Sequence, residues 1–116
     1  MHELAIAEHL IELIGKHVRE SGGQRAVRVT VQLGEMSGVM ADALLFCYEL
    51  AAKSTCADGS ELVIDSVPAV IECRSCQART CPVEFSMLCP ECGGSDTELV
   101  QGRDLLLREI EVINDV

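Results

Sequence analysis

The sequence has almost no aromatic residues: it lacks Trp and contains one Tyr and two Phe. Aliphatic side chains must therefore fill any core, and with 48% apolar residues a small core can form. Basic residues are also scarce, with nine Lys and Arg against nineteen Asp and Glu and a formal net charge of −10. Nucleic-acid binding is disfavoured, because it relies on positive charge along the phosphates and on aromatic side chains that stack on bases.

Long apolar runs and a targeting segment are absent from the pattern as well. The longest uncharged apolar stretches, such as residues 43–48, are far shorter than the roughly 20 residues that a membrane-spanning helix needs. The sequence does not open with the basic and apolar regions of a secretory signal peptide. We therefore expect a cytoplasmic protein without a membrane span.

Hydrophobic periodicity predicts five regular elements in the 116 residues. Apolar residues that recur every three or four positions indicate helices, and strict alternation indicates half-buried strands. Pro68 interrupts one of the strand patterns, which places that strand at a sheet edge or at a bend. The predicted elements are two helices over residues 4–20 and 40–54 and three strands over residues 27–33, 62–71 and 105–113.

This order of elements predicts an α+β fold: a small three-stranded sheet with two helices on one face. Residues 73–94 show neither period and hold most of the cysteines, so they are expected to form an inserted, zinc-ribbon-like domain with four cysteine ligands between the last two strands. Residues 1–72 and 95–116 would then form the α/β domain. Open sheet edges are compatible with a monomer or a weak homodimer.

Seven cysteines in so short a chain indicate metal binding rather than disulfides if the compartment is reducing. Two tight pairs, Cys73 with Cys76 and Cys89 with Cys92, are separated by twelve residues. Zn²⁺ prefers four ligands in a tetrahedron, and two such turns supply all four. Because four thiolates leave no open position for water, a zinc ion held here would be structural rather than catalytic.

Several alternatives to this zinc assignment stay open at the level of sequence. The pairs could be redox dithiols or buried cysteines, and iron also suits a tetrahedral site of four sulfurs. Cys81 offers a competing thiol, and Gln77 follows the first pair where a glycine would turn more easily. Cys47 is expected to pack as a small apolar side chain, and Cys56 to be a free thiol.

The N-terminal residues Met1 and His2 offer a second set of metal donors. The Met1 amine, the His2 amide nitrogen and the His2 imidazole can form a planar arrangement of three nitrogens, which Ni(II) and Cu(II) prefer. Glu3 or a partner's side chain could supply the fourth donor. On the residue pattern alone, however, an incidental histidine is the favoured interpretation of His2.

Taken together, the motifs resemble those of the HypA/HybF family, nickel-incorporation proteins for the maturation of NiFe-hydrogenase. The matching segments are Met-His-Glu-Leu-Ala-Ile-Ala at residues 1–7, residues 29–39, and Cys-Pro-Glu-Cys-Gly at residues 89–93. The resemblance changes the interpretation of His2 from an incidental histidine to a nickel ligand. It implies a nickel site at Met1, His2 and Glu3 and one structural zinc ion at Cys73, Cys76, Cys89 and Cys92.

The resemblance also implies partners: the maturation GTPase HypB and the large subunit of the hydrogenase, with urease maturation factors for some members. The leading hypothesis is a nickel metallochaperone, which makes and breaks no bond in a substrate and is not an enzyme. An enzyme is further disfavoured because the sequence has neither an open metal position nor an evident nucleophile with its base. The alternative is a zinc-ribbon protein-interaction adaptor in which nickel has no role.

Overall fold

The computed structural model describes residues 2–114 and divides the chain into two compact units. The first unit contains the described residues up to Val31, Val39–Asp65 and the described residues from Leu106 onward. The second unit contains Gln32–Gly38 and Ser66–Leu105. The second unit therefore includes more of the chain than the insert expected at residues 73–94.

The two helices of the first unit are α1 (Glu3–Ser21) and α2 (Ala41–Ala52), and they pack against each other. One stripe of α1 is buried, with the spacing of three and four residues that places side chains on one helical face. Gly22 ends α1 in the left-handed conformation at φ +76°, and its amide donates to a carbonyl of the last turn. The buried stripe of α1 consists of Glu3, Ala7, Leu10, Ile14 and Val18.

Leu13 departs from the predicted apolar face of α1. Its side chain is 39% exposed, whereas Ile14 is fully buried. Consecutive residues of an α-helix are rotated by about 100°, so Leu13 and Ile14 cannot both point at the core. The buried stripe is centred on Ile14, and Leu13 lies about 100° to one side of that centre.

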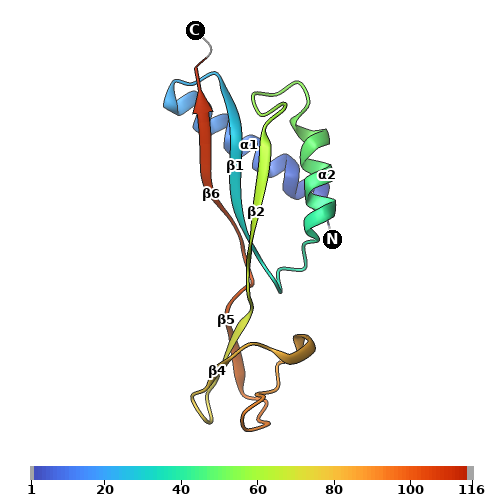
Figure 1. Cartoon of the computed structure of the whole chain (residues 1–116), viewed down its shortest axis with the longest axis vertical. Helices are drawn as coiled ribbons and strands as arrows, with labels where there is room; N and C mark the ends of the chain where they lie inside the picture. The colour runs from blue at the N-terminus through green and yellow to red at the C-terminus, as the bar shows by residue number, and fades with distance from the viewer. Residues whose placement is uncertain (1, 115–116) are drawn as a thin grey trace. The chain divides into compact units, whose positions relative to one another are not determined.

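The sheet of the first unit has the strand order β2-β1-β6. These strands span Glu61–Val67, Arg25–Gly34 and Leu105–Ile113, respectively. Val29 and Val31 of the central strand are fully buried, and Figure 1 shows both helices on one side of the sheet. This arrangement confirms the predicted fold class.

The second unit is built on a smaller antiparallel sheet with the strand order β4-β3-β5. These strands span Arg79–Thr80, Val70–Cys73 and Thr97–Gln101, and a short 3₁₀ turn, η1, covers Val83–Phe85. The central Ile71 is opposite Thr80 on one side and Leu99 on the other. Val70 and Ile71 of β3 fall within the strand predicted over residues 62–71, which is divided at Pro68 into β2 and β3 of two different sheets. The other two strands were not predicted, and β4, with two residues, is too short to show an alternating pattern.

Close backbone contact between two glycines connects distant segments of the second unit. A Cβ atom added to Gly34 would lie 2.3 Å from the carbonyl oxygen of Gly102, so no other residue fits there. The Gly34 amide donates to the carbonyl of Asp104 at 2.9 Å, and the Met36 amide donates to the carbonyl of Gly102 at 2.8 Å. Residues 32–38 are thereby joined to the segment that leads into β6.

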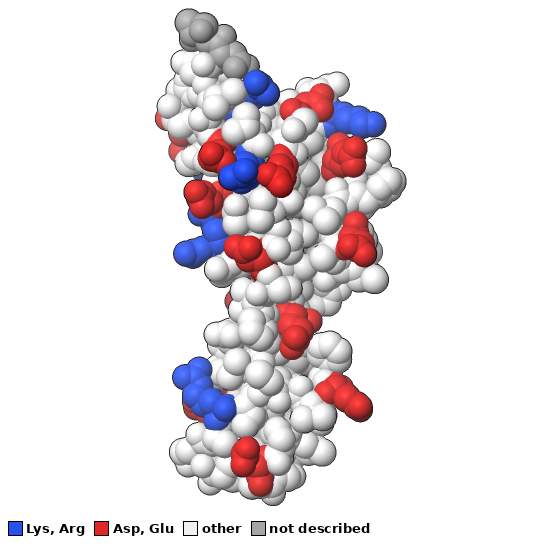
Figure 2. Space-filling view, viewed as in Figure 1, with Lys and Arg blue, Asp and Glu red and all other residues white. Residues whose placement is uncertain are grey.

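The face of the molecule seen in Figure 2 carries its charged side chains without a single dominant patch. Asp and Glu side chains are spread over the face seen in Figure 2. On the sheet of the first unit, the Arg28 guanidinium lies 3.1 Å from a Glu61 carboxylate oxygen and 3.4 Å from one of Glu111. Within residues 2–114, neither helix combines the length and the hydropathy that a bilayer crossing requires.

Candidate metal centre

The first of two cysteine turns, called the first knuckle, comprises residues 73–78. The Cys73 amide donates to the carbonyl of Ala78 at 3.0 Å, and the Gln77 amide donates back to the carbonyl of Cys73 at 2.9 Å. Gln77 adopts a left-handed conformation at φ +65°, which is unfavourable for a residue with a Cβ atom. Its side-chain amide donates to the Arg74 carbonyl at 2.8 Å, which offsets part of this strain.

The second knuckle, residues 89–94, repeats the same hydrogen bonds. The Cys89 amide donates to the carbonyl of Gly94 at 2.9 Å, and the Gly93 amide donates to the carbonyl of Cys89 at 2.8 Å. Gly93 occupies the position equivalent to Gln77 and has a similar backbone angle, φ +75°. A glycine adopts this angle without strain, so only the second knuckle has the residue that the turn favours.

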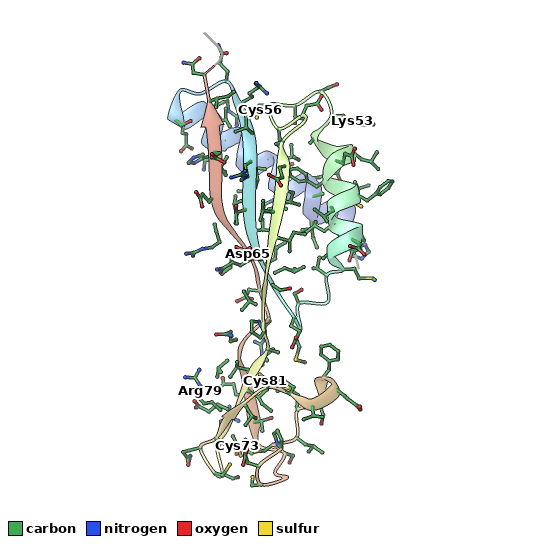
Figure 3. All side chains as sticks on the ribbon, in the orientation of Figure 1. Lys53, Cys56, Asp65, Cys73, Arg79 and Cys81 are labelled. Atoms are coloured by element: carbon green, nitrogen blue, oxygen red, sulfur yellow. The ribbon has the colours of Figure 1, made fainter. Side chains whose placement is uncertain are left out.

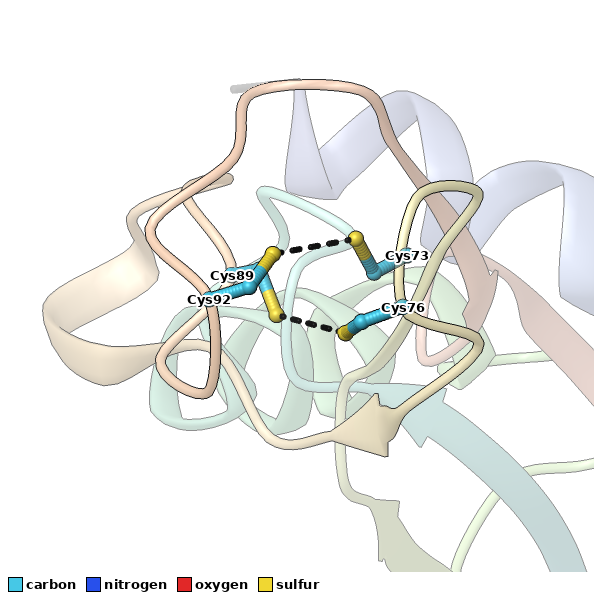
Figure 4. Close-up of side chains that lie close together, drawn as sticks. All are labelled: Cys73, Cys76, Cys89 and Cys92. Carbon is cyan, nitrogen blue, oxygen red and sulfur yellow. Dashed lines mark hydrogen bonds between the residues drawn. The ribbon is translucent and has the colours of Figure 1, made fainter.

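The two knuckles bring the four paired cysteines together. Their sulfur atoms all lie within 4.8 Å of one another. Across the knuckles, the Sγ atoms of Cys73 and Cys92 are 3.7 Å apart, as are those of Cys76 and Cys89 (Figure 4). A tetrahedral ion with metal–sulfur bonds of about 2.3 Å requires sulfur atoms about 3.8 Å apart, whereas a disulfide requires about 2.05 Å. The arrangement therefore fits a zinc ion at the centre of four sulfurs.

Burial divides the cluster in the same way in both knuckles. Cys73 and Cys89, the first cysteines of each knuckle, are 1% and 2% exposed, whereas Cys76 and Cys92 are exposed. A metal ion here would have protein on one side and would be coordinated by four sulfurs. Such a closed shell stabilises a fold and leaves no position for a reacting molecule.

The thiols of the first knuckle differ in their proton affinity. The backbone amide of Cys76 lowers the pKa of Cys73 to about 7. The Ala78 amide lowers the pKa of Cys76, but desolvation and the neighbouring thiols outweigh it and raise that pKa to about 12. Neighbouring thiolates repel one another, so losing the remaining protons requires a cation among the sulfurs.

An ion pair links the first knuckle to the strand that follows the second. The Arg74 guanidinium lies 2.7 Å from a carboxylate oxygen of Asp96 and 3.5 Å from one of Glu98, a residue of β5. The Arg74 amide also donates to the carbonyl of Asp96 at 2.9 Å. The backbone bond and the two side-chain contacts together hold the two halves of the cluster in register.

The other three cysteines lie outside the cluster. Cys81 is exposed and follows β4 (Figure 3), and it does not join the four clustered thiols. Cys47 and Cys56 are half-buried in the first unit. Among the described residues, no second group of His, Cys, Asp or Glu side chains is arranged to hold a metal ion.

Of the predicted nickel-site residues, His2 and Glu3 belong to the first unit, whereas Met1 lies outside the described residues. His2 is exposed, directly precedes α1 and makes no side-chain capping bond to that helix. Glu3 is only 8% exposed, and its Oε2 accepts a hydrogen bond of 3.2 Å from the Met40 amide. This bond lowers the pKa of Glu3 below its usual value.

Comparison with known proteins identifies the family. A protein-family model described as "Hydrogenase/urease nickel incorporation, metallochaperone, hypA" matches residues 1–112. The chain belongs to the HypA family. Because this is a family of metallochaperones, the prediction that the chain is not an enzyme is confirmed.

Relatives within the HypA family match over nearly their whole length. The hydrogenase maturation factor HypA of Geobacter metallireducens is 38% identical over 113 residues, which cover 97% of this chain and 99% of that protein. The hydrogenase maturation factor HypA of Geotalea uraniireducens is 35% identical over 112 residues, with the same coverage. The solution structure of the Ni metallochaperone HypA from Helicobacter pylori shares the fold, with a TM-score of 0.71 at 23% identity, covering 99% of this chain and all of that one.

Three features of this HypA-family chain were missed at the level of sequence. Glu3 falls on the buried stripe of α1 at the same spacing as Ala7 and Leu10, so helical periodicity could have indicated its burial. Nothing in the sequence pairs Glu3 with the amide of Met40. The conformation of Gln77 could have been inferred from Gly93 at the equivalent position of the other knuckle.

Proposed function

We propose that this chain binds Ni(II) at its N-terminus and delivers it to the large subunit of NiFe-hydrogenase during maturation. The main support for the proposal is that the HypA family model matches residues 1–112, a range that includes the Met-His-Glu segment at residues 1–3. The first unit is then the nickel-binding domain. Its cargo is handed over by ligand exchange, which requires a site that is exposed and incompletely coordinated.

The proposed nickel donors are the Met1 amine and the amide and imidazole nitrogens of His2, with Glu3 as their neighbour. Two fused chelate rings formed by adjacent residues hold Ni(II) in the planar geometry that it prefers. The exposed position of His2 ahead of α1 supports this role, because the imidazole is not used as a helix cap. All three nitrogens compete with protons, so nickel affinity should decrease as pH falls.

The proposed resident metal is one structural Zn²⁺ at Cys73, Cys76, Cys89 and Cys92. The sulfur separations of 3.7 Å support it, as they suit tetrahedral coordination. Iron would fit the same four sulfurs, and the metal content of the purified protein distinguishes the two. Zinc supplies no reaction here and stabilises the second unit.

The proposed partners act on either side of nickel delivery. The GTPase HypB would cooperate in loading, and the hydrogenase large subunit would receive the metal in the cytoplasm. The family description also includes urease, so urease maturation factors are proposed as further partners.

The test is a calorimetric Ni(II) titration of untagged, zinc-loaded protein beside His2→Ala, with zinc counted in both. His9→Ala is a matched control, because His9 is an exposed histidine on α1. The proposal predicts about one nickel per chain for the native protein and the His9 variant, none for the His2 variant, and one zinc throughout. A fourth sample with an N-terminal extension should lose tight binding, since its α-amine is displaced.

Equal nickel binding by the His2 and His9 variants would contradict the proposed site. The zinc-ribbon adaptor would then be the better description of the chain. Loss of zinc from the His2 variant would instead show that the two metal sites are not independent.

A further inference from the structure

We infer that the Glu3 carboxylate positions the nickel site by joining α1 to α2, and that it is not itself a nickel donor. The inference rests on the proposed function and specifies the role of one residue in it. It also implies that the fourth position around nickel is left for a ligand from outside, such as a donor atom of the acceptor protein.

The burial of Glu3 is the first observation that supports this role. Among the described residues, Glu3 is the one charged or polar residue that is buried, with 8% of its surface exposed. It lies on the same face of α1 as Ala7 and Leu10, which are directed at the packed interior. A carboxylate in such a position is costly unless hydrogen bonds compensate it.

The partner of Glu3 is the second observation. Its Oε2 accepts from the amide of Met40, the residue that caps the N-terminus of α2. Met40 provides no side-chain cap of its own, and its backbone is extended at φ −88° and ψ 121°. The negative charge of Glu3 therefore lies beside the partially positive end of α2, a favourable arrangement for both helices.

The position of His2 connects this contact to the nickel site. His2 immediately precedes Glu3, and its carbonyl accepts the first hydrogen bond of α1 from the Ile6 amide at 3.1 Å. The backbone on one side of the proposed donors is thus fixed by α1 and by the contact of Glu3 with α2. Moving the Glu3 carboxylate to a metal would break its bond to Met40 and remove this support.

Two variants of Glu3 separate a positioning role from a coordinating role. The amide oxygen of Gln in Glu3→Gln can still accept from Met40, whereas Glu3→Ala removes the contact. We expect Ni(II) affinity within about threefold of the native value for the Gln variant and at least about tenfold weaker for the Ala variant. The d–d absorption band of bound nickel should be unchanged in both, because the donor set is the same.

Protection of the Met40 amide from hydrogen exchange gives an independent readout of the contact. It should be retained in Glu3→Gln and lost in Glu3→Ala, with one zinc per chain in both as evidence that the second unit is intact. His2→Ala is measured alongside.

Three outcomes would overturn the inference. If both Glu3 variants lose affinity equally and the absorption band shifts in both, the carboxylate is a nickel donor, and the proposed function stands. If both variants bind nickel like the native protein, Glu3 has no role in the site. If His2→Ala binds nickel like the native protein, the proposed nickel site itself is wrong, and the inference fails with it.

Discussion

The two knuckles use the same backbone hydrogen bonds but different residues at the position where the chain must turn. In the second knuckle Gly93 adopts the left-handed conformation without strain. In the first knuckle Gln77 adopts it and donates its side-chain amide to the Arg74 carbonyl. The geometry required to present two sulfurs is thus met by two different sequences. A search for glycine after each cysteine pair would have recognised only the second.

The largest effect should come from removing a thiol, and it should be equal in the two knuckles. We expect Cys73→Ser and Cys89→Ser each to abolish tight zinc binding and to unfold the second unit, because small units of this kind depend on their metal. Zinc content and the NMR dispersion of residues 66–105 measure the two effects. Cys81→Ser is the matched control and should keep both, and loss of zinc from that variant would contradict the assignment of the four ligands.

Acidity should separate two thiols within the first knuckle. Because the pKa of Cys73 is about 7, this thiol has already lost its proton above pH 7. Below pH 7, zinc binding must release the Cys73 proton as well. Cys76, with a pKa of about 12, must lose a proton throughout. Zinc affinity therefore decreases as pH falls, and the plot of log affinity against pH should be steeper by about one unit below pH 7 than above it. Chelator competition from pH 6 to 8 checks this, and a constant slope would contradict the separation.

Exchanging the turn residues tests how the knuckles differ. Gly93→Ala should destabilise the zinc-loaded protein by about 1 kcal/mol, since a Cβ atom there meets no neighbour but must accept φ +75°. Gln77→Gly relieves the same strain and loses one side-chain hydrogen bond, so its effect should be close to zero. Urea unfolding at constant zinc measures both. A larger loss for the Gln77 variant would mean that the side-chain bond, rather than the backbone angle, dominates the first knuckle.

The smallest effect should come from the ion pairs that Arg74 of the first knuckle forms. Arg74→Ala removes the contacts of this side chain with Asp96 and Glu98. The side chains of all three residues are more than half exposed. Exposed pairs contribute little and are screened by salt, and the backbone bond to Asp96 remains. We expect the midpoint temperature of thermal unfolding to be slightly lower for Arg74→Ala than for the native protein at low salt, and equal for the two at high salt. A decrease that persists at high salt would show that Arg74 stabilises the cluster by packing instead.

Most of the first unit could be predicted because its elements are long and half-buried. The stripe of α1 and the alternation of β1 extend over enough residues for periodicity to be recognised, and Gly22 marks the end of the helix. The four clustered cysteines could be selected over Cys81 because a tetrahedral site requires paired ligands at short spacing.

The rest depends on contacts between residues distant in sequence. The sheet of the second unit is made of strands as short as two residues, whose pairing has no local signature. The bond between Glu3 and Met40 joins two helices across 37 positions, and only the packing of α1 against α2 creates it. For such features, the periodicity of the sequence indicates which face of a helix or strand is buried, but not which residues that face contacts.

The strand β1 begins in one unit and ends in the other, which has a consequence for folding during synthesis. Residues 32–34 of β1 belong to the second unit, whereas residues 25–31 belong to the first, where β6 is a neighbour of β1 in the sheet. All four clustered cysteines precede β6, so they leave the ribosome before the strand that completes the larger sheet. Metal ligation can thus constrain the nascent chain before β6 is synthesised. This constraint reduces the loop-closure entropy that β6 must overcome to pair with β1, a long-range pairing that otherwise folds slowly.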